Sequence, residues 1–381
     1  MSKKPDIPPH YYIKDMANEL EKKGRDILHM EIGEPDLDTH PDIIREMYNK
    51  ALEGYTHYGS VRGIPELREA LADYINDKLG LQFTMNNILA IPGSKISIFL
   101  LSYTFLRGDK KKVVLLTPTW GVYIYLVRDM GFDLALHKLV LENKWILTDE
   151  DIEKLKETDM DAIIVINPSN PTGAILPKEN IKAITDIARE KNAYIFADEI
   201  YFDLIYGDDE FHSFLQEGYE KAVGIYSFSK AYAMTGFRLG WIVASEDIVT
   251  TVSKKMQLMF TNIPTFIQYA GLKAMEMKEV IEENRQIYAK RTYLLSDGLE
   301  KLGFKFTRPK AGFYIFTKIP EGFEDGFDFA YKLLYEEGVT VAPGTAFGDY
   351  KDFIRFCSGV SEEVIEEALV RIERFLEKKG E

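Results

Sequence analysis

The stretch that decides the fold reads Ser227-Phe228-Ser229-Lys230-Ala231-Tyr232-Ala233-Met234-Thr235-Gly236-Phe237-Arg238-Leu239-Gly240-Trp241. It follows an apolar run, residues 223–226, which is typical of a short buried strand. A phosphate would be well bound there by the arginine and the Ser227 hydroxyl. A partly desolvated lysine beside other cations has a lowered pKa, and its amine can form an imine with a carbonyl. A phosphate site next to such a lysine indicates pyridoxal phosphate. The alternative is a solvated lysine with an arginine in a surface ion pair.

Around this stretch, residues 85–245 alternate short apolar runs with helical patterns. The runs cover residues 88–91, 113–116, 162–166, 194–197, 223–226 and 239–244. Because they are continuously apolar, they predict strands covered on both faces, as in a mostly parallel sheet flanked by helices. The fold class is therefore α/β.

The C-terminal part lacks the regular alternation of apolar runs and helical patterns, which predicts a second, smaller α+β domain. A proline-free helical region extends from residue 265 to about 302, and strand-like runs follow at 312–317, 339–342 and 353–356. The last helix is predicted to bury Val364, Ala368, Ile372, and Phe375 or Leu376 on one stripe. A chain of 381 residues fits two domains. We expect a large cofactor-binding domain over 46–284 and a small domain from 1–45 and 285–381.

Polar residues follow the predicted strands, where ligands bind in sheets of this kind. In chain order they are Gly93, Ser94 and Lys95, then Trp120, Asn170, Asp198 with Tyr201, and Lys230. A carboxylate such as Asp198 is suited to the ring nitrogen of pyridoxal phosphate, and Tyr201 and Asn170 to its ring oxygen. Taken singly, Asp198 also fits a helix N-cap or a core ion pair. Tyr201 fits a core tyrosine, and Asn170 fits an ordinary turn.

Several motifs together resemble the signature of fold-type I pyridoxal-phosphate-dependent aminotransferases, class I and II, of the aspartate aminotransferase-like kind. They are Asn170-Pro171-Thr172-Gly173, Asp198 with Tyr201, Ser227-x-x-Lys230 with Arg238, Gly33-Glu34-Pro35-Asp36, Tyr58 with Gly63, Arg355, and residues 341–348. The resemblance covers nearly the whole chain. It implies a large domain with a mostly parallel, seven-stranded type of sheet beside the smaller α+β domain.

The resemblance also implies a role for each site residue. Lys230 would hold the cofactor and move the proton between the substrate α-carbon and the cofactor. Asp198 would pair with the ring nitrogen, Asn170 and Tyr201 with the ring oxygen, and Trp120 would stack on the ring. The phosphate would lie among Ser94, Ser227, Arg238 and the partner subunit's Tyr58, with Gly93 and Lys95 completing the cofactor site.

Substrate recognition is assigned by the same resemblance to Arg355, Gly33, Asn170 and Lys95. Arg355 would bind the α-carboxylate as a two-pronged clamp, although an isolated arginine also fits a structural ion pair. Gly33 would let the backbone approach that carboxylate. Lys95 matches a lysine near the distal carboxylate of the substrate in some aspartate aminotransferases. The alternative is a lysine at a helix N-terminus that faces solvent or phosphate. The chain has no clear counterpart to a second substrate arginine.

Composition excludes several other classes. Acidic residues exceed basic ones, 61 to 47, giving a net charge of −14, so nucleic acid is an unfavourable partner. The first nine residues lack the apolar core of a signal peptide, and no apolar run reaches membrane-spanning length. With Cys357 as the only cysteine and six scattered histidines, no metal site is expected. These features predict a cytoplasmic protein.

The sequence thus predicts a cytoplasmic, homodimeric transaminase of amino acid metabolism with shared active sites. It would move an amino group from an L-amino acid, aspartate first, to a 2-oxo acid such as 2-oxoglutarate in two half-reactions. A related enzyme that eliminates from its substrate, a C–S β-lyase or a 1-aminocyclopropane-1-carboxylate synthase, is the alternative. A non-catalytic regulator that binds pyridoxal phosphate is the third possibility, although the chain has no spare length for a DNA-binding domain.

Overall fold

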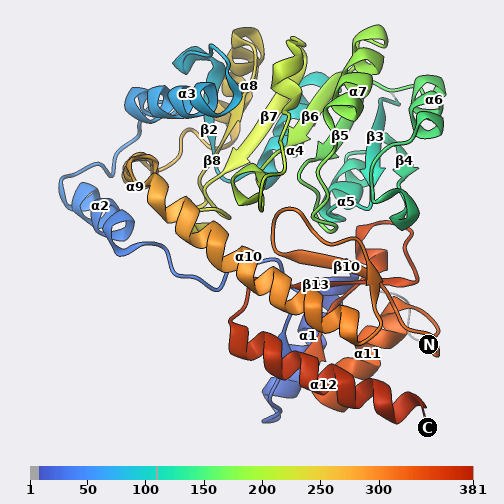
Figure 1. Cartoon of the computed structure of the whole chain (residues 1–381). Coiled ribbons are helices and arrows are strands. Elements are labelled where there is room, and N and C mark those ends of the chain that lie inside the picture. Colours follow the sequence, from blue (N-terminus) through green and yellow to red (C-terminus); the bar gives the residue numbers. More distant parts are fainter. Residues whose placement is uncertain (1–7, 109, 381) are drawn as a thin grey trace.

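A computed structural model describes residues 8–108 and 110–380, arranged as an α/β chain with a seven-stranded, a four-stranded and a two-stranded sheet. The interpretation of residues 1–7 as lacking a signal peptide lies outside the described residues. Figure 1 shows the seven-stranded sheet in the upper part and the smaller sheets below, with the long helix α10 (Lys278–Lys301) running between the two parts. No described helix has the length and apolar character needed to cross a membrane.

The seven-stranded sheet is mostly parallel, as predicted. Its order is β2 (Ile88–Ile91), β8 (Gly240–Val243), β7 (Ala222–Ser227), β6 (Tyr194–Asp198), β5 (Ala162–Ile166), β3 (Lys112–Thr117) and β4 (Asp133–Lys138). Only β8 runs antiparallel to its neighbours within this sheet. The sequence pattern missed β4, because it is an edge strand whose side chains are half-buried or exposed and whose three apolar residues, 134–136, are flanked by polar ones.

Helices cover this sheet on both faces, which is why its strands are continuously apolar. In β5, for example, Ile164 belongs to one core and Val165 to the other. The core that contains Ile164 includes residues of five helices, α3 (Pro65–Leu79), α4 (Lys95–Phe105), α5 (Val122–Asp129), α8 (Glu246–Met259) and α9 (Thr265–Glu276). The core that contains Val165 includes residues of α6 (Asp149–Glu157) and α7 (Lys178–Glu190).

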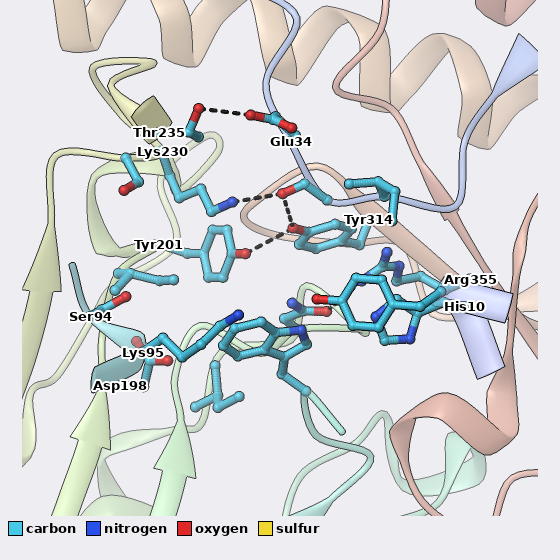
Figure 2. Close-up of a pocket in the computed structure, with 18 of the residues that line it drawn as sticks. His10, Glu34, Ser94, Lys95, Asp198, Tyr201, Lys230, Thr235, Tyr314 and Arg355 are labelled. Atoms are coloured by element: carbon cyan, nitrogen blue, oxygen red, sulfur yellow. Dashed lines mark hydrogen bonds between the residues drawn. The ribbon is translucent and has the colours of Figure 1, made fainter. Parts of the chain in front are cut away.

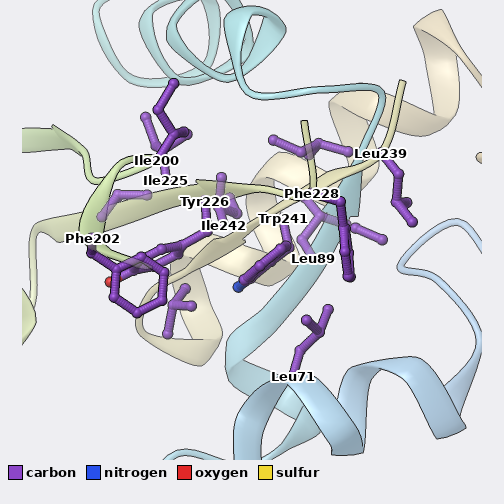
Figure 3. Close-up of a cluster of buried hydrophobic side chains, with 14 of the residues drawn as sticks. Leu71, Leu89, Ile200, Phe202, Ile225, Tyr226, Phe228, Leu239, Trp241 and Ile242 are labelled. Atoms are coloured by element: carbon purple, nitrogen blue, oxygen red, sulfur yellow. The ribbon is translucent and has the colours of Figure 1, made fainter. Parts of the chain in front are cut away.

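An aromatic cluster anchors the chain where β7 ends and β8 begins (Figure 3). The indole of Trp241 stacks on Tyr226, with ring centroids 5.6 Å apart, and lies 4.9 Å from the ring of Phe228. All three side chains are buried. Aromatic pairs of this kind add stability beyond the area they bury, so the loop that begins at Phe228 leaves the sheet from a fixed point.

The lower part has a core of its own. The four-stranded antiparallel sheet is ordered β12 (Ala342–Pro343), β13 (Phe353–Cys357), β10 (Tyr314–Lys318) and β9 (Lys305–Phe306). β1 (Leu28–His29) pairs in parallel with β11 (Val339–Thr340). Helices α1 (Pro9–Glu21), α11 (Gly326–Glu337) and α12 (Glu362–Gly380) pack on these strands. The N-terminal segment thus joins the C-terminal elements, as expected, while the domain boundaries near residues 46 and 284 stay predictions.

Several local predictions need correction. The helix predicted over 265–302 is two helices, α9 and α10, because Met277 leaves the helical conformation at φ −111° and ψ 59°. The strand predicted over 339–342 is divided between β11 and β12, which belong to different sheets. In α12 the buried stripe begins with Ile365, and Val364 is only half-buried.

The remaining elements are short connections. Helix α2 (Pro41–Leu52) packs against α9. Single turns of 3₁₀ helix lie at η1 (Met85–Asn87), η2 (Leu141–Asn143), η3 (Phe202–Leu204), η4 (Phe214–Glu217), η5 (Thr235–Phe237) and η6 (Gly344–Phe347).

Candidate active site

A cavity of about 380 Å³ lies between the ends of the parallel strands and the lower part of the chain (Figure 2). Most of the predicted site residues line it, namely Gly33, Ser94, Lys95, Trp120, Asn170, Asp198, Tyr201, Lys230, Arg238 and Arg355. Gly93 and Ser227 lie directly behind this lining. Tyr58 is 89% exposed and does not line it.

Lys230 follows β7 on the loop anchored by Phe228. Its Nζ donates a hydrogen bond to the carbonyl oxygen of Gly33 at 2.6 Å, and the ring centroid of Phe313 lies 5.7 Å away. Burial lowers the pKa of the Lys230 amine to about 8, and the positive charge of Arg355 acts in the same direction. About one-tenth of the amine is therefore neutral, and hence nucleophilic, at pH 7.

Asp198 ends β6 and is almost fully buried. Its Oδ2 accepts a hydrogen bond from the hydroxyl of Tyr123 at 2.6 Å, while Oδ1 has no hydrogen-bond partner among the described residues. Burial raises the pKa of this carboxyl to about 6, and the bond from Tyr123 opposes the rise. Buried carboxylate oxygens are nearly always bonded, so Oδ1 marks a place for a donor.

Ser94, Ser229 and Arg238 all line the cavity. Ser94 precedes α4, whose first turn has no acidic residue and no side-chain cap, so its backbone N–H groups favour an anion. Gly93 has φ +82°, and a Cβ there would lie 2.4 Å from Nη2 of Arg238. Only glycine lets the guanidinium lie so close to the backbone.

Of the two serines just before Lys230, Ser229 lines the cavity, whereas the motif had indicated Ser227. The Ser227 hydroxyl donates to Oγ of Ser229 at 2.9 Å and lies behind it. The sequence could have suggested Ser229, because it also flanks the lysine.

Arg355 lies in β13 and is buried. Its Nη1 donates to Oδ1 of Asn170 at 3.1 Å and its Nη2 to the carbonyl oxygen of Glu31 at 2.5 Å. The guanidinium lies 4.5 Å from the ring centroid of Tyr314 and 4.8 Å from that of Phe347. It is therefore fixed between two rings. Asn170 offers its amide nitrogen to a ligand, because its oxygen is occupied by Arg355.

Tyr314 was not predicted, although it links several site residues (Figure 2). Its hydroxyl lies 2.9 Å from that of Tyr201 and donates to the carbonyl oxygen of Gly33 at 3.4 Å. A Cβ at Gly33 would lie 2.1 Å from this hydroxyl, which gives the physical reason for glycine there. No spacing in the sequence links Tyr314 to the site.

His10 and Tyr11 were also missed, and they reach the cavity from α1. His10 is only 4% exposed, and its Nδ1 has no hydrogen-bond partner among the described residues. Burial, together with the charges of Arg355 and Lys95, lowers the pKa of His10 to about 3. The Nζ of Lys95 lies 4.9 Å from the ring centroid of Trp120, and burial lowers the Lys95 pKa.

The residues present fit pyridoxal phosphate. A nucleophilic amine, an unpartnered carboxylate oxygen, an anion-binding end and a tryptophan face line one cavity of suitable size. Within the described ranges, no group of three or more His, Cys, Asp or Glu side chains is placed to hold a metal ion.

Several known proteins are similar to this chain. The family model described as aminotransferase class I and II matches residues 25–372. The chain is 35% identical to the (5-formylfuran-3-yl)methyl phosphate transaminase of Methanocaldococcus jannaschii, over 95% of each chain. It is 36% identical to an aspartate aminotransferase of Pyrococcus horikoshii, over 94% of this chain and 93% of the relative. The solved structure of aspartate aminotransferase from Thermus thermophilus with maleate is similar, with a TM-score of 0.90, 31% identity and 97% coverage of each chain.

Proposed function

This chain belongs to the class I and II aminotransferases, which depend on pyridoxal phosphate, and we propose that it transfers the amino group of an acidic L-amino acid, aspartate first, to a 2-oxo acid such as 2-oxoglutarate. The observation that carries this proposal is the shared cavity of Lys230, Asp198 and Arg355. These three side chains would supply a base, an anion and a carboxylate clamp around one small volume.

Each of these groups has a role that its surroundings explain. Pyridoxal phosphate, when bound, supplies a ring that accepts the electron pair left when a bond at the substrate α-carbon breaks. Asp198 would hold a proton on the ring nitrogen through Oδ1. Lys230, whose pKa burial lowers to about 8, would take the α-proton and return it on the other side of the transferred nitrogen.

Arg355 would fix the orientation of the substrate. Its fork faces a cavity in which a carboxylate can accept two parallel hydrogen bonds. Because the guanidinium is held by Asn170, Glu31 and two rings, it needs little reorganisation when substrate binds. A carboxylate fixed in this way sets the direction of the α-carbon bonds relative to Lys230.

The preference for an acidic side chain is supported by relatives and by charge. Several relatives are named aspartate aminotransferases, and the relative from M. jannaschii is named for a substrate that bears a phosphate. Lys95 adds a further cation to the cavity, besides Lys230, Arg238 and Arg355. A second acidic group on the substrate would therefore find a partner.

We also propose a cytoplasmic homodimer in which Tyr58 reaches the phosphate site of the partner subunit. Ile44, Tyr48 and Leu52 are exposed on one face of α2, spaced four residues apart, and Tyr55 and Tyr58 follow on the next loop. Charged substitutions, Tyr48→Glu with Leu52→Glu, should halve the mass measured by light scattering. An unchanged dimer would refute this interface. The location rests on the net charge and the single cysteine.

A panel of amino acids, scored by the change in the cofactor's visible spectrum in a single half-reaction, tests the reaction. Aspartate and glutamate should convert the spectrum and release their 2-oxo acids, and 2-oxoglutarate should reverse the change. Release of pyruvate and ammonia from cysteine conjugates without any 2-oxo acid acceptor would instead identify a β-lyase. A spectrum that no amino acid changes, as expected for a non-catalytic regulator, would refute both the transaminase and the β-lyase.

A further inference from the structure

Behind the Arg355 clamp lies a buried carboxylate that none of the roles above uses. Glu31 follows β1 and is fully buried. Its Oε2 accepts a hydrogen bond from the hydroxyl of Thr340 in β11, and its Oε1 lies 3.1 Å from Nδ1 of His29. An ionised carboxylate is costly to bury unless partners bond it and balance its charge. Glu31 therefore depends on these two contacts.

The main chain of the same residue contacts the clamp. The Glu31 carbonyl oxygen accepts the hydrogen bond from Nη2 of Arg355 at 2.5 Å. One residue earlier, the Met30 N–H donates to the hydroxyl oxygen of Thr340 at 3.0 Å, and the Met30 carbonyl accepts from the N–H of Cys357 at 2.9 Å. Residues 30–31 thus lie against β13, the strand that carries Arg355, and the carboxylate of Glu31 anchors them to β11.

The geometry around His29 favours the protonated ring. Its Nδ1 faces Glu31, and its Nε2 lies 3.2 Å from Oε1 of Glu21 at the end of α1. A neutral imidazole has one N–H, so only the imidazolium can donate to both carboxylates. The hydrogen bond to Glu31 raises the pKa of His29, Glu21 acts in the same direction, and burial opposes the rise. Although burial of Glu31 favours the neutral acid, its bonds with His29 and Thr340 lower its pKa.

The other elements around β1 add no competing charge to this pair. The neighbouring strand β11 presents the neutral hydroxyl of Thr340. Helices α11 and α12 contact β11, and their charged groups are engaged in ion pairs, namely Glu337 with Arg374 and Lys378, and Arg371 with Asp26 and Glu367.

We propose that Glu31 and His29 are positioning residues for the carboxylate clamp: their ion pair fixes the carbonyl that holds Arg355, and the clamp binds more weakly when His29 loses its proton. The inference rests on the proposed function, because it takes Arg355 as the partner of the substrate α-carboxylate. His29 itself lies outside the lining of the cavity, so it acts on the substrate only through Glu31.

The sign of the pH dependence follows from this geometry. Below its raised pKa, His29 is charged and balances Glu31. As the pH rises through that pKa, the ring turns one lone pair toward a carboxylate, and Glu31 is left buried with less support. The stability that the pair contributes is complete below the ordinary histidine pKa and is lost as the pH rises through the raised one. The affinity of the clamp for a carboxylate falls over the same range.

Spectral titration of the cofactor-loaded protein with succinate between pH 6 and pH 9 tests the proposal. We expect the affinity of the wild-type protein to fall about three- to tenfold through the His29 pKa, and His29→Gln to lack this step. Glutamine can still donate to Glu31 but does not titrate. Titration of the cofactor itself contributes equally to both profiles. Identical profiles for His29→Gln and wild type would overturn the proposal.

Two further variants identify the source of the step. Glu21→Gln removes the outer carboxylate, so it should move the midpoint to lower pH and leave the size of the step unchanged. His212→Gln is the matched control, because His212 pairs with Glu217 at 2.6 Å and does not line the cavity. It should retain the wild-type profile, and loss of the step in this variant would contradict the assignment to His29.

Linkage supplies a readout that a merely structural role would not move. If the proton on His29 tightens carboxylate binding three- to tenfold, bound succinate must raise the pKa of His29 by about half to one pH unit. Nuclear magnetic resonance of the histidine ring protons, with the His29 signal assigned by its loss in His29→Gln, measures this pKa. The same pKa with and without succinate would overturn the proposal.

These measurements need no turnover, so they separate the two proposals. A half-reaction that fails while the succinate step remains refutes the proposed function and leaves His29 as a positioning residue for a carboxylate site. An active transaminase whose succinate affinity lacks the step refutes only the role of Glu31 and His29.

Discussion

The two walls of the cavity are built in different ways. One wall, which we name the cofactor wall, consists of Ser94, Asp198, Tyr201, Lys230 and Arg238, and all five lie at the end of, or in the loops after, strands of one sheet. The other, the substrate wall, consists of His10, Gly33, Tyr314 and Arg355. These residues come from α1, from the loop after β1, from strand β10 and from strand β13. Parallel strands bring their carboxyl ends to one edge, whereas the substrate wall depends on packing between segments far apart in the chain.

The difference also appears in their charges. The cofactor wall pairs a carboxylate of raised pKa with a lysine of lowered pKa, a combination suited to proton transfer. The substrate wall has a fixed arginine and a neutral histidine, a combination suited to binding anions. Substitutions in the cofactor wall should therefore mainly lower kcat, and those in the substrate wall should mainly raise KM.

The largest effect is expected for Lys230→Ala. It removes both the covalent attachment and the base, so kcat should fall by about 10⁴-fold or more, and borohydride should no longer fix the cofactor to the chain. Turnover and mass spectrometry after reduction measure the two effects. Lys221→Ala, at a half-buried lysine just before β7 that does not line the cavity, is the control and should be unaffected. Near-normal turnover of the Lys230 variant would remove the basis of the cofactor wall.

Asp198→Asn is expected to come second, with kcat lowered about 100- to 1,000-fold and KM changed little. The amide has nearly the same shape but no charge to hold a proton on the ring nitrogen. Glu199→Gln is a matched control, because the neighbouring carboxylate is bonded by Ser213, Tyr226 and the backbone of Phe214 and does not line the cavity. It should alter the unfolding midpoint more than kcat, and equal losses of kcat in both variants would contradict the role of Asp198.

The sequence predicted the cofactor wall almost completely, for a physical reason. Continuous apolar runs identify buried parallel strands, and chain order alone then places the residues that follow them at one edge. The strand it missed, β4, lies at the edge of the sheet, where one-sided exposure removes the pattern. The helix break at Met277 was also invisible, because neither proline nor glycine marks it.

In the substrate wall, the sequence predicted only the residues that belong to a family motif. Arg355 and Gly33 were expected from resemblance, but Tyr314 lies 281 residues from Gly33 and no local pattern relates them. His10 gave no signal, because a histidine near a predicted helix is most often an ordinary surface or core residue. Its place in the cavity results from the packing of α1 against β12 of the four-stranded sheet.

Arg355→Lys tests whether the substrate wall acts through geometry or through charge alone. Lysine keeps the charge but lacks the planar fork and the stacking between Tyr314 and Phe347. We expect KM for aspartate to rise about 10- to 100-fold with a smaller change in kcat. Steady-state kinetics measures both constants. An unchanged KM would mean that the α-carboxylate binds elsewhere.

The lowered pKa of Lys230, in the cofactor wall, predicts how the rate of cofactor binding depends on pH. Only the neutral amine attacks an aldehyde, so the rate at which the cofactor-free protein binds pyridoxal phosphate should rise with pH and level off above about 8. At pH 7 it should be about one-tenth of the plateau. Stopped-flow absorbance gives the rate, with an Nα-blocked lysine as the reference for changes in the free aldehyde. A rise that continues to pH 10 would contradict the effect of burial.

The smallest effect, and the most informative about how the two walls are joined, is expected for Tyr314→Phe. The ring that stacks on Arg355 remains, while the hydroxyl between Tyr201 and Gly33 is lost. One such bond contributes about 1 kcal/mol, so kcat/KM should fall about fivefold. The pH at which the cofactor's visible band changes should also shift, because Tyr201 no longer has a fixed partner beside the ring oxygen. Tyr206→Phe loses a similar buried bond, to Thr292, outside the cavity, and should change only thermal stability. If Tyr314→Phe changes neither the band nor kcat/KM, the two walls act independently, and the hydroxyl pair only fills space between them.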